Sequence, residues 1–325
     1  MHYCPEIGLA KLFRPLPKAK GERPALSVEY QPEGETFSLQ FSAKAVLGIP
    51  EQTLLLVLLE LAKEQYAASA QELVLDSSTT GELGLSLWHQ LTKGNTRAPD
   101  KALRLQTTWH ELNRLYGEQI GGSATATRRM QLKRLCEVVV WEVERDRRNT
   151  ERQSYLVVLL TGDDERIHIA LNARLASALL GSHYRQVSLT ERAALSKDVA
   201  KAVHAFLSTA VSRGRSLRIG IETLLERFWP GSRAHAPAKT HSSRRGYIVA
   251  ALKAIDKLAA WSVQRERSDL VQVRRKAQTD GEMTSHIPRK STSYPRPLTA
   301  KCPSKINELE SFDVSGIFFS KKRSA

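Results

Sequence analysis

Residues 240–276 of this 325-residue chain are THSSRRGYIVAALKAIDKLAAWSVQRERSDLVQVRRK, and this stretch decides the fold. Ile248, Leu252 and Ile255 recur at the spacing that places side chains on one face of an α-helix. An apolar face of this kind packs on a hydrophobic core. The spacing therefore predicts a helix whose opposite, polar face is open to solvent or to a ligand.

The residues on either side of this apolar face complete the pattern. Ser242 and Ser243 precede it, and a serine at this place is expected to cap the first N–H groups of the helix. Two segments that alternate apolar and polar residues follow, at 261–265 and 270–274, as in a β-hairpin. A helix followed by a basic hairpin is the order of a winged helix, in which the helix enters the major groove of DNA.

The same order is predicted once more, earlier in the chain. A helix over 109–116 is followed by a basic helix that Ser123 or Thr125 is expected to cap. Strands at 138–143 and 155–160 are then expected to pair as a second hairpin around an arginine-rich loop. The chain thus contains two copies of one architecture without a repeat of residues.

These patterns predict an α+β fold built from two tandem winged-helix domains. The composition changes after residue 276, where Ser, Thr, Pro and Lys become frequent and large apolar residues become rare. The expected divisions are an N-terminal arm (1–22), a first winged-helix domain (23–181), a second winged-helix domain (182–276) and a disordered basic tail (277–325).

The charge of the chain favours a polyanionic partner. Lys and Arg number 49 against 34 Asp and Glu, which gives a formal net charge of +15 and an isoelectric point near 9.8. Arginines lie inside the two helix-hairpin units as well as in the tail, so nucleic acid is favoured over an acidic membrane surface. The alternative is a surface charge that serves only solubility.

The candidate DNA-contacting residues are polar and basic side chains of the two helices and the two hairpins. Those on the helices are expected to contact base edges or phosphates, since arginine can form bidentate bonds with guanine. Those on the hairpins are expected to contact phosphates. The helix set is Arg128, Arg129, Lys133, Arg134, Ser242, Ser243, Arg244, Arg245 and Tyr247; the hairpin set is Arg145, Arg147, Arg148, Arg265, Arg267 and Arg274.

No motif for catalysis, metal binding or a cofactor is found in the sequence. The nine histidines are scattered, the three cysteines are far apart, and no Gly-x-x-x-x-Gly-Lys-Ser/Thr loop is present. The sequence therefore predicts that the protein is not an enzyme and holds neither metal nor cofactor. The apolar run at 54–61 is too short to span a bilayer and no secretory signal is evident, so the cytoplasm is the expected compartment.

Several short motifs between Ile7 and Arg275 resemble one known family, the RepC-type replication initiators of IncQ-like broad-host-range plasmids. They belong to the plasmid initiators built from two winged helices. The matching residues are Gly8-Leu9, Leu12-Phe13, Leu26-Ser-Val-Glu-Tyr30, Ile169-Ala-Leu-Asn172, Ala178, Val187-Ser-Leu189, Leu224, Phe228-Trp-Pro-Gly-Ser232 and Ala259-Ala-Trp261.

The resemblance implies a function and a set of partners. Members of the family bind directly repeated iterons at the plasmid origin, open the adjacent A+T-rich DNA and bring in a plasmid helicase and primase. The resemblance also implies homodimers that pair through the first domain. The family pattern does not extend over the tail, so it implies no role for residues 277–325.

Two other classes of protein share the expected fold and charge. A tandem winged-helix transcriptional regulator would bind an operator and recruit no helicase. A partition or chromatin-like binder would bind DNA with little sequence preference. Evenly spaced direct repeats on the DNA would favour the initiator, whereas one promoter palindrome would favour the regulator.

Overall fold

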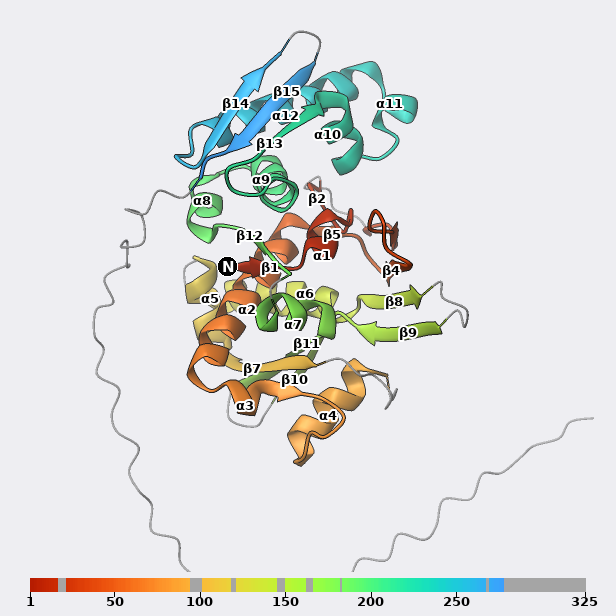
Figure 1. Cartoon of the computed structure of the whole chain (residues 1–325), viewed down its shortest axis with the longest axis vertical. Coiled ribbons are helices and arrows are strands. Elements are labelled where there is room, and N and C mark those ends of the chain that lie inside the picture. The colour runs from red at the N-terminus through yellow and green to blue at the C-terminus, as the bar shows by residue number, and fades with distance from the viewer. Residues whose placement is uncertain are drawn as a thin grey trace, which may run out of the picture. The chain divides into compact units, whose positions relative to one another are not determined.

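The computed structural model describes residues 1–16, 22–93, 101–117, 121–144, 150–161, 166–181, 183–266 and 269–277. Residues Met1–Thr279 form one compact unit, shown in Figure 1. The tail that the sequence predicts to be disordered lies outside the described residues from 278 onward.

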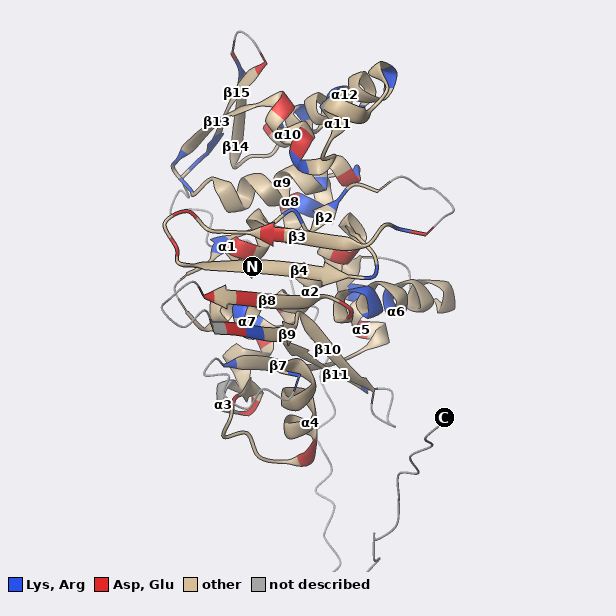
Figure 2. Cartoon of the chain, turned by 90° about the vertical axis from the view of Figure 1, so that its right-hand side faces the viewer, with Lys and Arg blue, Asp and Glu red and all other residues tan. Residues whose placement is uncertain are grey.

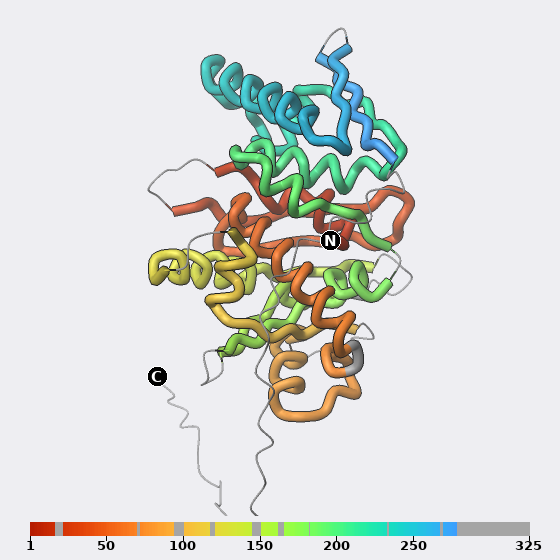
Figure 3. The backbone as a smooth tube through the Cα atoms, turned by 90° about the vertical axis from the view of Figure 1, so that its left-hand side faces the viewer, coloured from red at the N-terminus to blue at the C-terminus, as the bar shows by residue number. Residues whose placement is uncertain are grey.

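The helix α2 (Ile49–Ala68) lies at the centre of this unit, as the tube in Figure 3 shows. Its first turn contains Pro50, which the start of a helix tolerates, and the Glu51 carboxylate accepts the N–H of Gly48 at 2.8 Å. The leucines of α2 are buried all round the helix, as expected for a fully enclosed helix. They are Leu54, Leu55, Leu56, Leu58, Leu59 and Leu61.

Two antiparallel four-stranded sheets belong to the part of the chain before residue 181. One has the order β3-β4-β8-β9 and the other β10-β11-β7-β6. The strands of the first are β3 (Leu26–Tyr30), β4 (Phe37–Ala43), β8 (Val139–Glu144) and β9 (Thr150–Tyr155); those of the second are β10 (Val157–Thr161), β11 (Arg166–Leu171), β7 (Ala102–Thr108) and β6 (Val74–Leu75). The helices are α1 (Pro5–Leu9), α3 (Ala70–Leu73), α4 (Glu82–Leu91), α5 (Trp109–Tyr116), α6 (Gly122–Cys136) and α7 (Ala173–Leu180).

The part after residue 181 has the predicted winged-helix order. Its three-stranded antiparallel sheet has the order β13-β15-β14, and the hairpin places Trp261 opposite Arg275. Ile248, Leu252 and Ile255 are buried, so the predicted apolar face of the helix is confirmed. The elements are β12 (Arg185–Gln186), α8 (Leu189–Ala194), α9 (Asp198–Ala210), β13 (Ser216–Gly220), α10 (Ile221–Phe228), α11 (Ser232–His235), α12 (Ala238–Asp256), β14 (Trp261–Arg265) and β15 (Leu270–Arg275).

The N-terminal residues differ from the predicted arm, because they lie in the core. Tyr3, Ile7 and Leu12 are each at most 1% exposed. The strand β1 (His2–Tyr3) pairs with β12, and β2 (Phe13–Arg14) pairs in parallel with β5 (Leu47–Gly48). These apolar residues are too few to form a core of their own, but they fill space between elements that are distant in sequence.

The first hairpin forms with a different partner from the one expected. β8 pairs with β9, which is the polar segment TERQSY, whereas β10 joins β11 in the other sheet. β9 is an edge strand, and an edge strand needs no apolar alternation when its face is solvated. The central strand β7 was not predicted either. Its residues do alternate between buried and less buried positions, but they directly follow a stretch whose composition is typical of a loop.

The caps predicted for α6 and α12 were wrong. α6 begins at Gly122 with Gly121 before it, so Ser123 and Thr125 lie inside the helix. α12 begins at Ala238, directly after Pro237, whose ring fixes φ and which has no N–H to satisfy. The hydroxyl of Ser243 instead donates to the carbonyl of Lys239 at 2.9 Å, one turn earlier in the same helix.

A large hydrophobic core includes residues from Tyr3 to Val273, and a smaller separate cluster contains Leu87 and Trp88 of α4. The buried Arg192 of α8 connects the parts on either side of residue 181: it donates to Gln52 of α2 at 3.0 Å and to the carbonyl of Lys201 at 2.8 Å. The residues before and after 181 are therefore joined by buried contacts. The division of the chain into two domains at this residue stays a prediction.

Candidate nucleic-acid interface

The outward face of α12 combines small side chains with lysine. Ser242, Gly246 and Ala250 are exposed at successive turns, and Lys253 follows on the same face. Apart from its chain neighbours and the nearby backbone of its own helix, no described atom lies within 4 Å of the position that a Cβ on Gly246 would take. Tyr247 is 57% exposed beside this face. A helix with such a surface can approach the floor of a groove closely, with its cation near the phosphates.

The two arginines of α12 have partners within the protein. Arg244 donates to the hydroxyl of Ser232 at 3.1 Å, and its guanidinium lies 5.6 Å from the centre of the Trp229 ring. Arg245 forms ion pairs with Glu222 of α10 and with Asp269 at the tip of the hairpin. Hydrogen bonding from Arg245 holds the pKa of Asp269 below its usual value. Arg245 is thus positioned by carboxylates before any DNA is bound.

A groove lies between α12 and the wing formed by β14 and β15. It is lined by Ser242, Arg245, Gly246, Val249, Ala250, Lys253 and Arg265. Arg265 is 57% exposed, and its guanidinium lies 3.4 Å from the same Asp269 carboxylate that pairs with Arg245. Arg274 is exposed on β15. Arg267 was also predicted to contact DNA and lies outside the described residues.

On α6 the structure divides the four predicted cations into two kinds. Arg129 and Lys133 are exposed, as contact with DNA requires. Arg128 is fully buried, where it donates to Gln131 and lies 3.5 Å from the centre of the Tyr116 ring, so its assignment to DNA was wrong. The helical period explains the difference: Arg128 falls on the side of α6 that carries the buried leucines.

The fourth cation, Arg134, is paired inside the protein. Its guanidinium lies 2.8 Å from the carboxylate of the fully buried Glu51, which also binds Arg23 at 2.9 Å. Removing this carboxylate would leave two cations without their partner. Arg134 therefore fixes α6 to α2, and it is less available to DNA than Lys133. The predicted hairpin arginines Arg145, Arg147 and Arg148 lie outside the described residues.

The two basic helices match in register. The helix α6 ends at Cys136 and its hairpin ends at Tyr155. The helix α12 ends at Asp256 and its hairpin ends at Arg275, so each hairpin ends the same number of residues after its helix. Counting back from the helix ends therefore places Lys133 and Lys253 at the same position. Lys253 was not predicted to contact DNA, because the contacts predicted on this helix all lie in its first half. The period measured from Ile248 and Leu252 would have placed it on the exposed face.

Both helices are also presented on the same side of the unit. Figure 2 shows α6 and α12 toward one edge of the chain, with Lys and Arg gathered on α6. In the opposite view of Figure 3 both lie toward the corresponding edge, so the two views agree. The two basic helices therefore lie toward one edge of the unit.

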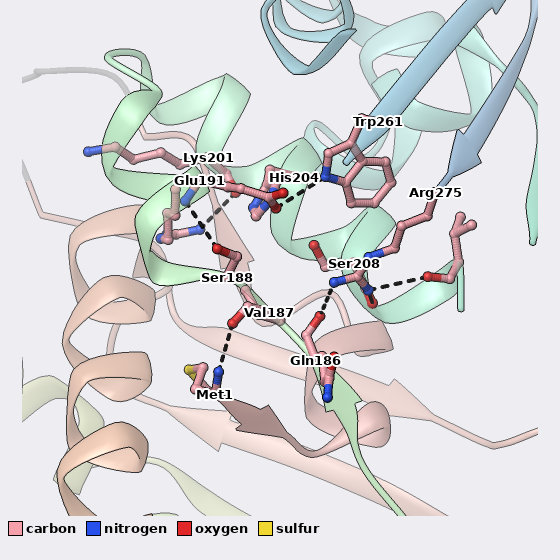
Figure 4. A network of polar contacts seen from close by, with 12 residues as sticks. Met1, Gln186, Val187, Ser188, Glu191, Lys201, His204, Ser208, Trp261 and Arg275 are labelled. Atoms are coloured by element: carbon pink, nitrogen blue, oxygen red, sulfur yellow. Dashed lines mark hydrogen bonds and ion pairs between the residues drawn. The ribbon is translucent and has the colours of Figure 1, made fainter. Parts of the chain in front are cut away.

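A buried polar network holds the base of the second wing, as Figure 4 shows. The Glu191 carboxylate accepts from the indole N–H of Trp261 at 3.2 Å and lies 2.9 Å from Nε2 of His204. Arg275 donates to the carbonyls of Ser208, at 3.0 Å, and Gln186, at 2.7 Å. Burial lowers the pKa of His204, which favours the neutral form of its ring. These contacts fix where β14 and β15 leave the core.

Within the described ranges, no three His, Cys, Asp or Glu side chains are grouped as metal ligands would be. No described helix combines the length and the apolar character that crossing a membrane requires.

Comparison with known proteins identifies one family. The chain matches the model of the family "Replication protein C (RepC)" over residues 2–276. No curated protein matches the chain in sequence. Among solved structures, a crystal structure of selenomethionine derivatives of domains 2 and 3 of RctB is 9% identical, has a TM-score of 0.48, and covers 84% of this chain and 98% of its own. A second crystal structure of RctB domains 2-3 is 10% identical, has a TM-score of 0.47, and covers 84% and 97%.

Proposed function

The chain belongs to the RepC family of replication initiators, and we propose that it binds directly repeated iterons at a plasmid origin. The observation that carries this proposal is the pair of basic helices α6 and α12 on one side of the unit. Each helix enters one major groove, and successive grooves on one side of B-DNA are about 34 Å apart. The expected footprint is about 20 bp on each repeat.

The residues divide between the two kinds of contact. The outward face of α12, with Ser242, Ser243 and Tyr247, lies against base edges, and so does the corresponding face of α6 next to Arg129. Lys133, Lys253, Arg265 and Arg274 contact phosphates, because they are exposed cations at the ends of the helices or on the wing. The proposed assignment of Arg145, Arg147, Arg148 and Arg267 to phosphates is unchanged.

Binding to several adjacent repeats would bend the DNA and lower the free energy needed to open an A+T-rich tract beside them. The opened strand is then handed to a plasmid helicase and primase that the protein recruits. In this scheme the chain performs no catalytic step. In the absence of DNA, copies pair through the part of the chain before residue 181, where β3 is an edge strand of its sheet among the described residues. A sedimentation series that finds only monomer at every concentration would remove the dimer.

Footprinting of the purified protein on its own replicon tests the proposal. The experiment is carried out at about 0.15 M salt with competitor DNA, which suppresses purely electrostatic binding. Protection of evenly spaced direct repeats beside an A+T-rich tract supports the initiator, and a helicase pull-down on the same DNA then tests recruitment. Protection of one promoter palindrome would instead indicate a regulator, and the absence of a discrete footprint would indicate a non-specific binder.

A further inference from the structure

Arg245 is held by two carboxylates that come from different elements. Its Nε lies 3.4 Å from the Glu222 carboxylate in the first turn of α10. Its Nη2 pairs with Oδ1 of Asp269, at the turn between β14 and β15. The Arg245 side chain is 31% exposed and lines the groove between α12 and the wing. A cation meant only to attract a polyanion has no need of two carboxylates beside it.

Each of the two acidic residues has a further contact within the protein. The backbone carbonyl of Asp269 accepts the N–H of Ile221 at 2.9 Å, which joins the tip of the wing to the start of α10. Asp269 has φ of 53°, a left-handed conformation that aspartate and asparagine adopt more readily than most residues. The second oxygen of Glu222 lies 3.1 Å from Nε2 of His241. The two carboxylates thus form a cradle for the arginine that is tied to α10, α12 and the wing.

The cradle leaves part of the guanidinium available. Arginine has five N–H donors; Glu222 engages the one on Nε, and Asp269 engages Nη2. Among the described residues, none pairs with Nη1. The two Nη atoms can therefore still donate side by side from the end of the group, which is the fork that matches O6 and N7 of guanine.

We propose that Glu222 and Asp269 are positioning residues that hold Arg245 ready to recognise one guanine in each repeat. This inference rests on the proposed function. It assigns to Asp269 and Glu222 a role in sequence discrimination, although their negative charge opposes binding to any DNA. The two explanations, charge alone and positioning, therefore predict different effects when one carboxylate is removed. By charge alone, affinity for every sequence rises equally; by positioning, discrimination at one base pair is lost.

The experiment begins with the wild-type full chain and a random-sequence duplex library, from which the preferred site is selected. Each guanine of that site is then replaced in turn by 7-deazaguanine, which lacks the N7 acceptor. One guanine is expected at which this replacement weakens wild-type binding about tenfold and leaves binding by Arg245→Ala unchanged. This coupling identifies the base that Arg245 contacts.

The variants Asp269→Asn and Glu222→Gln test the cradle. Each removes one negative charge with little change in shape, and asparagine tolerates the backbone conformation of Asp269. Both are expected to reduce the tenfold effect at that guanine, with discrimination at the other positions intact. Glu266→Gln is the matched control, because Glu266 on the wing pairs with Arg218 and not with Arg245. Thermal melting confirms that all the variants are folded.

Two results would overturn the inference. In the first, Asp269→Asn raises affinity for selected and random DNA by the same factor while the effect at the guanine persists. In the second, no guanine is coupled to Arg245, which makes this arginine a phosphate contact. If the wild-type chain selects no preferred site from the library, the proposed function itself is contradicted. This outcome is distinguishable from the other two, because it is obtained before any variant is tested.

Discussion

Replacement of Lys253 by alanine should weaken binding to all DNA and reduce its dependence on salt. Lys253 is exposed on the outward face of α12 and lines the groove beside the wing. None of the carboxylates in the described residues lies within ion-pair distance of it. The ammonium group of Lys253 can therefore bind a phosphate without breaking an ion pair inside the protein. Arg245, by contrast, is paired with Asp269.

The magnitude follows from counterion release. One phosphate contact contributes about 0.9 to the slope of log K against log salt concentration. Between about 1 M and 0.15 M salt, a slope of about 0.9 amounts to roughly a fivefold difference in affinity, or about 1 kcal/mol. Lys253→Ala is thus expected to bind about fivefold more weakly at 0.15 M salt. The order of preference among sequences should not change, since a phosphate carries no sequence information.

Fluorescence anisotropy with a labelled origin fragment, repeated at several salt concentrations, measures both the affinity and the slope. Lys197→Ala is the matched control, because it removes the same charge at the start of α9, the helix against which the buried side of α12 packs. An unchanged slope for Lys253→Ala, or an equal loss for Lys197→Ala, would show that α12 does not place Lys253 against a phosphate.

Three further predictions concern stability. Glu51→Gln should lower the free energy of unfolding by about 2 kcal/mol in urea titrations, since Arg23 and Arg134 lose a buried carboxylate but stay partly solvated; a change near zero would contradict the ion-pair account. Arg128→Met should lower the melting temperature and leave the salt slope of DNA binding unchanged, and a lower slope would restore this residue to the interface. Burial lowers the pKa of His204 below its usual value of 6.5, so the stability that the neutral ring contributes is complete above pH 6.5 and declines as the pH falls below it. Melting temperatures of His204→Gln, measured against pH, should lack this decline. The same decline in the variant and the wild type would contradict the prediction.

Much of the second winged helix could be predicted from sequence because its signals are local. The spacing of Ile248, Leu252 and Ile255 gave the buried face of α12, and the alternation after Trp261 gave the wing. Both depend on residues a few positions apart, which is the range over which helix and strand periods act. In the first part of the chain the polar edge strand β9 carries no such signal, so its hairpin was assigned to the wrong partner.

The assignment of individual contacts could not be completed in this way. Arg128 and Lys133 belong to one helix and are equally basic, yet one is buried against Tyr116 and the other is exposed. The helical period separates them only once the buried side of α6 is known. Sequence reasoning gave Arg245 as a contact but not its two carboxylates, since Glu222 and Asp269 lie on separate elements.

The sequence by itself determined that this is a basic, two-winged-helix member of the RepC family, because composition, short motifs and local periods are properties of the linear chain. Only the tertiary structure decided which cations face outward and which are bound internally. It also decided that the N-terminal residues complete the core around α2. These outcomes depend on burial and on charges brought together from distant positions, and the free energy of such contacts is set by the folded surroundings of each group.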